Sequence, residues 1–550
     1  MRLVRAAGGQ SRPVNSVNTM SHQVELTVLG VLVAVVGLLL LAGRTRIPYP
    51  ILLVLGGLAI GFVPGITTIE LPPDLVLLIF LPPLLYGASF FSSLRDLRAN
   101  LREISLLSVG LVLATVVSVA VVAHAVAGLP WAVAFVLGAI VSPTDPVAAT
   151  SIASRLGVPR RVVTIIEGES LINDGTALVA YRFALGAVLS GSFSLWLAGI
   201  QFVLSAIGGV AIGLLTGYVV ASIRRRLDNP LVEITISLVT AYFAYLPAEA
   251  LGVSGVLAAV TVGIYMGWRA PELITPSTRI QAFSIWEILT FLLNTALFVL
   301  IGLQLRPLLE GLAGESPAQL ALYAAAVVAA VIGTRIVWVF VLTYLPRRVS
   351  AKLRERDPSP PWQLTFLVSW TGLRGAVSLA AALAIPQTLA SGEPFPGRDL
   401  IIFLTFCVIV ATLVFQGLSL PPLIRALDLE DDDSDRREET EARLRAAEAA
   451  IGRIDELAGE EWVRDGTADR LRGLYDYRRR RFATLMGETD GQGDETDYEG
   501  RTGAFMRLRM ELLQAERDTL VRMRNERRIS DEVLRRVERD LDLEEARLEG

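Results

Sequence analysis

The sequence is poor in the residues that build cross-linked and metal-held folds. Its 550 residues include one cysteine, Cys407, and two histidines, His22 and His124. These are too few for a disulfide framework, or for a zinc site of cysteine and histidine ligands, within one chain. Residues 1–21 also lack the apolar core of a signal peptide. The sequence therefore excludes these classes of structure.

Charged side chains are scarce over most of the chain and dense at its end. The apolar content is 52%, above the 45–50% that is usual for soluble proteins. Residues 428–550 carry 35 acidic and 24 basic residues, so their formal charge is −11, and the rest of the chain carries +7. The composition therefore indicates a basic membrane part followed by an acidic, solvated tail.

Thirteen apolar segments of about 20 residues, the length that spans a bilayer, fill the first part of the chain. The odd-numbered loops between them carry 18 basic residues and the even-numbered loops carry two. Because cytoplasmic loops hold the excess of arginine and lysine, we expect the N-terminus outside the plasma membrane and the C-terminus in the cytoplasm. The predicted segments are 24–42, 47–66, 75–91, 104–127, 130–153, 162–189, 196–223, 231–249, 251–268, 280–303, 318–345, 363–386 and 399–422.

The predicted fold is an all-α polytopic membrane protein with about 13 transmembrane helices and a cytoplasmic α-helical domain. A polar segment, residues 1–23, precedes the transmembrane domain, residues 24–422, and the tail covers residues 428–550. The tail is either an ordinary charged appendage or a dimerising or regulatory domain. Its predicted helices are 435–458, 467–487 and 504–548, with a break at Ser530 and a flexible spacer at Gly487–Gly503.

Four carboxylates lie within two very apolar segments between Val141 and Asp174. A charge at the centre of a bilayer costs about 2.5–3.5 kcal/mol, so such residues usually face a protein interior or an ion pathway. Two prolines bracket the first carboxylate and predict a broken helix at mid-membrane, which is tolerated where it lines a cavity. The carboxylates are Asp145, Glu167, Glu169 and Asp174, and the prolines are Pro143 and Pro146.

Asp174 is the candidate for binding a monovalent cation or a proton. A hard cation such as Na+ prefers oxygen ligands, and one buried carboxylate can be neutralised by either ion, which is sufficient for antiport. Ser170 lies one turn earlier on the same helix face and offers another oxygen, while Asn173 can hold the shape of the pocket. Alternatively, Asp174 is a silent cap or pairs with an arginine.

Thr144 and Asp145 lie at the predicted break, where a hydroxyl, freed carbonyls and helix-end dipoles can coordinate a cation. Alternatively, Asp145 only neutralises the exposed helix ends. Glu169 should point away from Asp174 and needs a cation of its own. We expect it to pair with Arg335, which lies mid-segment and needs a carboxylate equally. Glu167 lies nearer the cytoplasmic end, where water can solvate it.

A second unwound helix is predicted in the twelfth segment. It lies within Ser369–Leu379 and includes Gly372, Arg374 and Gly375. The first break is in the fifth segment, seven segments earlier. Interruptions at matching positions of two halves point to a transporter built from two inverted repeats.

Four motifs occur in order: S-P-T-D-P-V-A-A, G-E-S-L-I-N-D-G-T-A, N-T-A-L-F-V-L-I-G from Asn294, and G-L-R-G-A-V-S. Over residues 24–422 the chain thus resembles bacterial sodium/proton exchangers of the monovalent cation:proton antiporter-1 family. The resemblance implies a transporter, not an enzyme, that exchanges cytoplasmic Na+ for external H+ by elevator motion. Li+ and K+ are further candidate substrates, and K+/H+ antiport for pH homeostasis is the alternative. The Asn-Asp form of the second motif resembles the electroneutral branch.

The resemblance also implies a homodimer in the lipid bilayer, with no cofactor and no nucleic acid. A dimerisation domain would cover about residues 24–91 and 231–303, and a mobile core about residues 104–189 and 318–422. The implied ion site has crossed, discontinuous helices and a charge pair beside it. Its residues are Asp174 as ion and proton carrier, Asn173 as partner, Ser170 and Thr144 as ligands, Asp145 at the unwound helices, and the pair Glu169–Arg335.

One position departs from the family pattern. Many members carry an acid after the L-P-P-L-L-F/Y motif, whereas Leu81–Tyr86 is followed here by Gly87. A carboxylate that closes or ligates the ion site in relatives is therefore missing, and this bears on ion selectivity.

Two other classes compete with antiport. An intramembrane aspartyl protease also needs two membrane aspartates, but its G-x-G-D signature is absent, because Asp174 follows Leu-Ile-Asn. A cation channel or sensor would need no strict proton coupling, and no repeated filter sequence is present.

Overall fold

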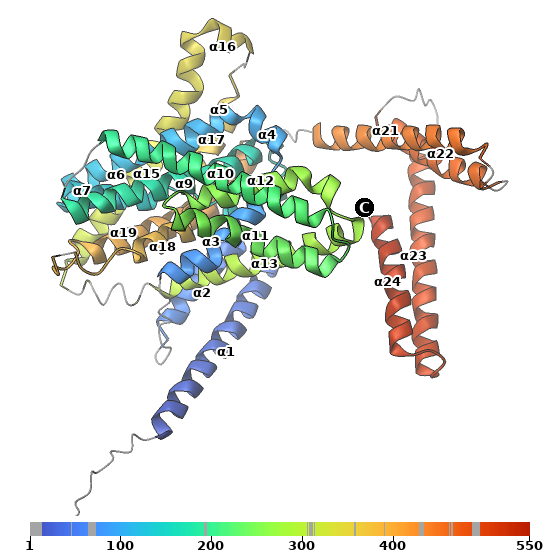
Figure 1. Cartoon of the computed structure of the whole chain (residues 1–550), viewed down its shortest axis with the longest axis horizontal. Coiled ribbons are helices and arrows are strands. Elements are labelled where there is room, and N and C mark those ends of the chain that lie inside the picture. The colour runs from blue at the N-terminus through green and yellow to red at the C-terminus, as the bar shows by residue number, and fades with distance from the viewer. Residues whose placement is uncertain are drawn as a thin grey trace, which may run out of the picture. The chain divides into compact units, whose positions relative to one another are not determined.

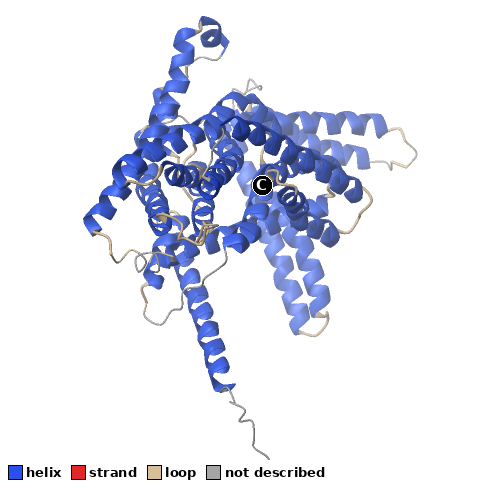
Figure 2. Ribbon diagram, turned by 60° about the vertical axis from the view of Figure 1, so that its left-hand side comes forward, coloured by secondary structure: helices blue, strands red, loops and turns tan. Residues whose placement is uncertain are grey.

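The computed structural model of the chain consists of helices joined by loops (Figure 1) (Figure 2). The chain divides into two compact units, Met1–Asp432 and Asp433–Gly550. The structure describes residues 14–45, 47–63, 73–191, 195–304, 306, 312, 314–356, 359–389, 391–427, 434–460, 462–463, 466–486 and 495–549.

The first unit contains long apolar helices and two helices that are interrupted in the middle. They are α1 (Val14–Arg44), α2 (Tyr49–Gly61), α3 (Pro73–Phe91), α4 (Leu94–Ala99), α5 (Leu101–Ser105), the π-helix η1 (Leu106–Leu111), α6 (Val112–Ala127), α7 (Trp131–Val141), α8 (Pro146–Arg155), α9 (Arg160–Ser190), α10 (Leu195–Arg224), α11 (Pro230–Ala250), α12 (Gly255–Leu273), α13 (Pro276–Leu303), α15 (Pro317–Val349), α16 (Ala351–Arg356), α17 (Trp362–Trp370), α18 (Ala376–Leu383), α19 (Arg398–Ala411), the π-helix η2 (Thr412–Gln416) and α20 (Gly417–Ala426).

Each predicted apolar segment coincides with a helix or an interrupted pair of helices, although some ends differ. Helix α1 begins at Val14, so part of the polar segment predicted for residues 1–23 is helical. A short turn containing Gly252, at φ 72°, separates α11 from α12. Among the described residues, seven helices are long and apolar enough to cross a membrane. Three predicted segments extend beyond the described residues: residues 1–13 of the polar segment, 64–66 of the second apolar segment, and 428–433, 461, 464–465, 487–494 and 550 of the tail.

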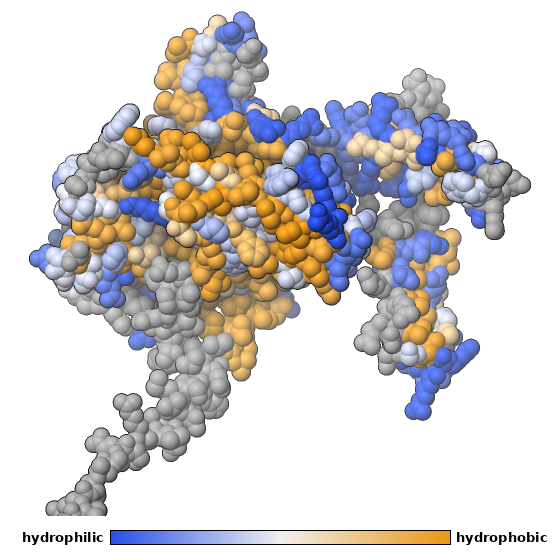
Figure 3. Space-filling view, viewed as in Figure 1, coloured by the Kyte–Doolittle hydropathy of each residue, from blue (hydrophilic) through white to orange (hydrophobic). Residues whose placement is uncertain are grey.

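The helices of the first unit pack in two groups. In one group α2 packs on α13, and α12 packs between α3, α10 and α11; in the other, α6, α7 and α9 pack together and α15 packs on α6, α17 and α19. Apolar side chains cover much of the visible surface of these helices (Figure 3). Leu204, Ile207 and Leu215 of α10 are among the exposed apolar side chains. Exposed apolar surface over this extent is typical of helices that face lipid.

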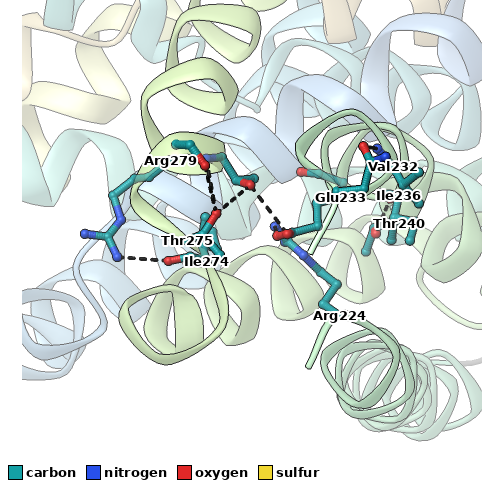
Figure 4. A network of polar contacts seen from close by, with 12 residues as sticks. Arg224, Val232, Glu233, Ile236, Thr240, Ile274, Thr275 and Arg279 are labelled. Atoms are coloured by element: carbon teal, nitrogen blue, oxygen red, sulfur yellow. Dashed lines mark hydrogen bonds and ion pairs between the residues drawn. The ribbon is translucent and has the colours of Figure 1, made fainter. Parts of the chain in front are cut away.

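A buried ion pair joins the end of α10 to the start of α11 (Figure 4). Arg224 Nη2 lies 3.4 Å from Glu233 Oε2, and both side chains are almost fully enclosed. Thr278 Oγ1 of α13 donates to Glu233 Oε1 at 3.4 Å, and Thr275 Oγ1 donates to Thr278 Oγ1 at 2.9 Å. The carboxylate also lies in the first turn of α11, where the helix dipole favours negative charge. The network thus ties three helix ends together.

The second unit contains two helical hairpins, α21 (Ser434–Leu457) with α22 (Thr467–Leu485) and α23 (Glu495–Asn525) with α24 (Asp531–Glu549). Helix α23 begins within the predicted spacer, so the assignment of residues 495–503 to a flexible segment was wrong. The third predicted helix is divided near Ser530, whose Oγ accepts from Val533 N–H at 3.2 Å and caps α24.

We expect Arg224→Ala to destabilise the protein, because Glu233 would remain buried without its cation. Removing one partner of a buried pair costs about 3–5 kcal/mol. The measurement is the melting temperature in detergent, read from the loss of the folded peak in size-exclusion chromatography after heating. Arg225→Ala is the matched control, since this neighbouring side chain is exposed. Equal melting temperatures for the two variants would contradict the structural role of the pair.

Candidate functional site

The two interrupted helices meet at their unwound segments. Ser142–Asp145 separates α7 from α8, and Thr371–Gly375 separates α17 from α18. The backbone N–H of Asp145 donates to the carbonyl of Leu373 at 2.8 Å. Because unsatisfied backbone groups are costly inside a membrane, each break supplies partners for the other.

Side chains satisfy further backbone groups at these breaks. Asp145 caps α8, its Oδ1 accepting from Val147 N–H at 2.9 Å. Arg374 is buried, and its Nε donates to the Val141 carbonyl at the end of α7 at 3.1 Å. Its cation thus lies where the dipole of α7 favours positive charge. A side chain at Gly375 would collide with the Asp145 carboxylate, so only glycine fits there.

Glu169 of α9 and Arg335 of α15 form a bidentate ion pair. Arg335 Nη1 lies 2.5 Å from Glu169 Oε1, and Nη2 lies 2.8 Å from Oε2. Both residues are 1% exposed, so each charge depends on the other for compensation. Arg335 Nη2 also donates to the Val368 carbonyl of α17 at 3.0 Å, which links three helices.

Thr144 connects this pair to the face of α9 that carries Asn173 and Ser170. Its hydroxyl donates to Glu169 Oε1 at 3.1 Å and accepts from Asn173 Nδ2 at 2.7 Å. Its carbonyl accepts from Ser170 Oγ at 2.8 Å. The unwound segment is therefore fixed to α9 by three hydrogen bonds from one residue.

Asp174 lies at the wall of a cavity of about 340 Å³ next to these breaks. It is 6% exposed, and no group in the described part of the chain donates a hydrogen bond to its carboxylate or pairs with it. Two of the other carboxylates have partners, because Glu169 is paired with arginine and Asp145 caps a helix. Polar residues of the cavity wall include Thr144, Asp145, Glu167, Ser170, Asp174, Asn294 and Ser378.

The structure brings the predicted site residues together around the two breaks. Gly375 lies at the cavity, while Gly372 and Arg374 are buried behind it, where a side chain at Gly372 would collide with Arg335. Sequence reasoning missed Ser378, a buried serine of α18 that lines the cavity; its place in the G-L-R-G-A-V-S motif was the available signal.

Gly87 also lines the cavity. A Cβ atom there would lie 3.1 Å from Thr290 Cγ2 and 3.3 Å from Trp286 Cε3 of α13. The position at which the family pattern predicts an acid thus faces the site, but α13 packs tightly against it.

These features define a class: a polytopic membrane transport protein with paired helix breaks around a buried carboxylate. A family model described as "Sodium/hydrogen exchanger, transmembrane" matches residues 31–426. The chain therefore belongs to the sodium/hydrogen exchanger family of monovalent cation:proton antiporters, which are membrane proteins.

Known relatives cover most of the chain. An uncharacterized Na+/H+ exchanger of Mycobacterium tuberculosis is 38% identical over 527 residues, which are 95% of this chain and 96% of the relative. The low-affinity Na+/H+ antiporter NhaS1 of Synechocystis is 37% identical, with 78% of each chain covered. The sodium, potassium, lithium and rubidium/H+ antiporter of Bacillus subtilis is 34% identical over 68% of this chain and 58% of its own length.

Among solved structures, the sodium proton antiporter MjNhaP1 of Methanocaldococcus jannaschii at pH 8 has the same fold. The TM-score is 0.57 at 22% identity, and the alignment covers 74% of this chain and 99% of that one.

Replacing Arg335 with methionine should destabilise the protein, because Glu169 would be left buried and unpaired, at a cost of about 3–5 kcal/mol. The measurement is the melting temperature in detergent. The double variant Arg335→Met with Glu169→Leu should recover part of the loss, since it removes both charges. A single variant as stable and as active as the wild type would contradict the role of this pair.

Proposed function

We propose that the protein exchanges cytoplasmic Na+ for external H+, with Asp174 binding either ion. The observation that carries this proposal is the Asp174 carboxylate, which lies at the cavity without a protein partner among the described residues. A carboxylate in a membrane must be neutralised before it moves, and a proton or a cation does so equally. Because one negative charge accepts one positive charge in each direction, the exchange would be electroneutral.

Several oxygens near Asp174 suit a hard cation. Ser170 Oγ uses its proton on the Thr144 carbonyl, which leaves its lone pairs available. Asn173 Oδ1 is buried and accepts no hydrogen bond in the described part of the chain. We assign Asp174, Ser170 and Thr144 as ligands, with Asp145 and Asn173 completing the site, and Glu169–Arg335 as the charge pair that holds its shape.

The transmembrane arrangement supports alternating access. The proposal has thirteen spans in two inverted repeats, with the N-terminus outside and the tail in the cytoplasm, and the breaks in spans five and twelve cross at the site. Helices α1–α3 and α11–α13 would form the dimerisation domain of a homodimer, and α5–α9 with α15–α20 the core that moves as an elevator. The packing of α2 on α13 and of α12 on α3 and α11 supports the first domain, on which α10 also packs, and the packing of α15 on α6, α17 and α19 supports the second.

In this orientation the cavity extends toward the cytoplasmic side, because Phe91, Thr150 and Glu167 lie at its wall. The outer side is closed by contacts between α9 and the helices α11 and α12. Arg182 pairs with Glu249 there, and Leu171 packs in an apolar cluster with Tyr245 and Val256. With the proposed orientation, this would be a state open to the cytoplasm.

The names of the relatives guide the proposal of a substrate among Na+, Li+ and K+. The Synechocystis relative is named for Na+ alone, whereas the Bacillus relatives are named for sodium, potassium, lithium and rubidium. We propose Na+ as the principal substrate and K+/H+ exchange, serving K+ efflux and pH homeostasis, as the alternative.

Asp174→Asn should abolish exchange and leave the protein folded, because the amide cannot take up or release the proton. The measurement is proton flux in liposomes of purified protein with a preset pH gradient, to which Na+, Li+ and K+ are added in turn. Glu272→Gln is the control, since this carboxylate is 65% exposed on α12. Exchange retained by Asp174→Asn would refute the proposal, and uncoupled cation flux in the wild type would indicate a channel.

Glu249→Arg should slow exchange several-fold, because it places two arginines where the outer closure must form in every cycle. Combining it with Arg182→Glu restores an opposite-charge pair and should recover the rate. The same flux assay measures both variants. If the double variant is no faster than the single one, the pair does not form the outer closure.

A further inference from the structure

A second cavity of about 120 Å³ lies on the side of the unit to which the basic loops belong. Its wall is formed by α5 and η1, the first turns of α9, the last turns of α15, and α17. Three arginines from three helices line it: Arg102 of α5, Arg161 of α9 and Arg347 of α15. None of them belongs to the ion site.

Positive charge exceeds negative charge at this cavity. Glu103 is the one acid in its wall, and its Oε1 lies 3.6 Å from Arg161 Nη2 and 3.7 Å from Arg347 Nη2. Arg161 Nε also donates to Asn100 Oδ1 at 3.0 Å, and Arg347 Nη1 donates to the Thr343 carbonyl at 2.7 Å, which fixes both guanidinium groups at the wall. Arg102 is exposed and makes no ion pair within the described residues. Three arginines and one acid thus line the wall, and the guanidinium group of Arg102 is available to a further negative group.

The rest of the wall is apolar. Leu107, Val162, Ile165, Val339 and Val368 are buried side chains that line it. A small soluble anion would contact only the arginines. A molecule with both a phosphate and a hydrocarbon chain can contact the arginines and the apolar side chains together. Basic pockets between transmembrane helices on the cytoplasmic side bind anionic headgroups in this manner.

We propose that this cavity binds an anionic phospholipid of the cytoplasmic leaflet. The phosphate lies against Arg102, Arg161 and Arg347, and an acyl chain packs on the apolar wall. Guanidinium groups suit this role because their donors match phosphate oxygens in pairs. The proposal depends on the orientation given by the basic loops and is independent of which cation is exchanged.

The bound lipid would stabilise the helices that carry the Glu169–Arg335 pair. Val368 lines this cavity, and its carbonyl accepts from Arg335. Ile165 lines it one helical turn before Glu169 on α9. The cavity thus touches the helices that hold the Glu169–Arg335 pair. The wall also includes Leu106 and Leu107 of the π-helix η1, and such irregular turns are frequent at functional sites.

The test is a binding titration of the full-length protein in a neutral detergent. Short-chain dioctanoyl-phosphatidylglycerol is added, and binding is followed by native mass spectrometry and by the rise in melting temperature. Arg102→Gln should weaken binding about fivefold, the contribution of one arginine near an anionic lipid. Arg98→Gln is the matched control, because Arg98 is an exposed arginine of the neighbouring α4 that does not line the cavity.

Further arms separate the lipid from other ligands. Leu364→Trp fills the apolar part of the cavity and should also lower the affinity for phosphatidylglycerol. Phosphatidylcholine of the same chain length and inorganic phosphate should stabilise the wild type far less. Equal stabilisation by inorganic phosphate or phosphatidylcholine would overturn the lipid assignment, and so would equal binding by the Arg102→Gln and Arg98→Gln variants.

Discussion

The ion pair between Glu169 and Arg335 is the interaction on which the site depends. Both residues of this bidentate pair are 1% exposed, and the pair carries no net charge of its own inside the membrane. Glu169 then fixes the Thr144 hydroxyl, and Thr144 fixes both Asn173 and Ser170. In the proposed mechanism, Glu169 keeps its arginine partner and Asp174 is the carboxylate that exchanges one ion for the other.

The two helix breaks impose a second constraint, because every freed backbone group needs a partner at membrane depth. Each break supplies a partner to the other. The N–H of Asp145 donates to the Leu373 carbonyl, and the Arg374 side chain donates to the Val141 carbonyl at the end of α7. The contact is so close that Gly375 admits no side chain next to the Asp145 carboxylate. Polar ligands therefore line a cavity at a point where several freed backbone groups have partners.

Much of this arrangement could be predicted from the sequence, since charges in apolar segments are rare and must find one another. Glu169 and Arg335 are 166 positions apart, yet the apolar segments offer each of them few oppositely charged partners. Proline and glycine likewise marked both breaks. What could not be predicted depends on three-dimensional packing: the contact between Asp145 and Leu373, the place of Ser378 in the cavity, and the tight cover of α13 over Gly87. The helical start of α23 within a spacer rich in glycine and acidic residues was also missed, because glycine and aspartate have low helix propensity.

The most direct test of the central claim is to count the protons released when Na+ binds to the purified protein in weakly buffered detergent. If Asp174 carries either ion, the wild type should release about one proton per bound Na+ at a pH where the site is protonated. The Asp174→Asn protein should release none. Proton release that persists in this variant, or Na+ binding to the wild type without proton release at any pH, would contradict the account.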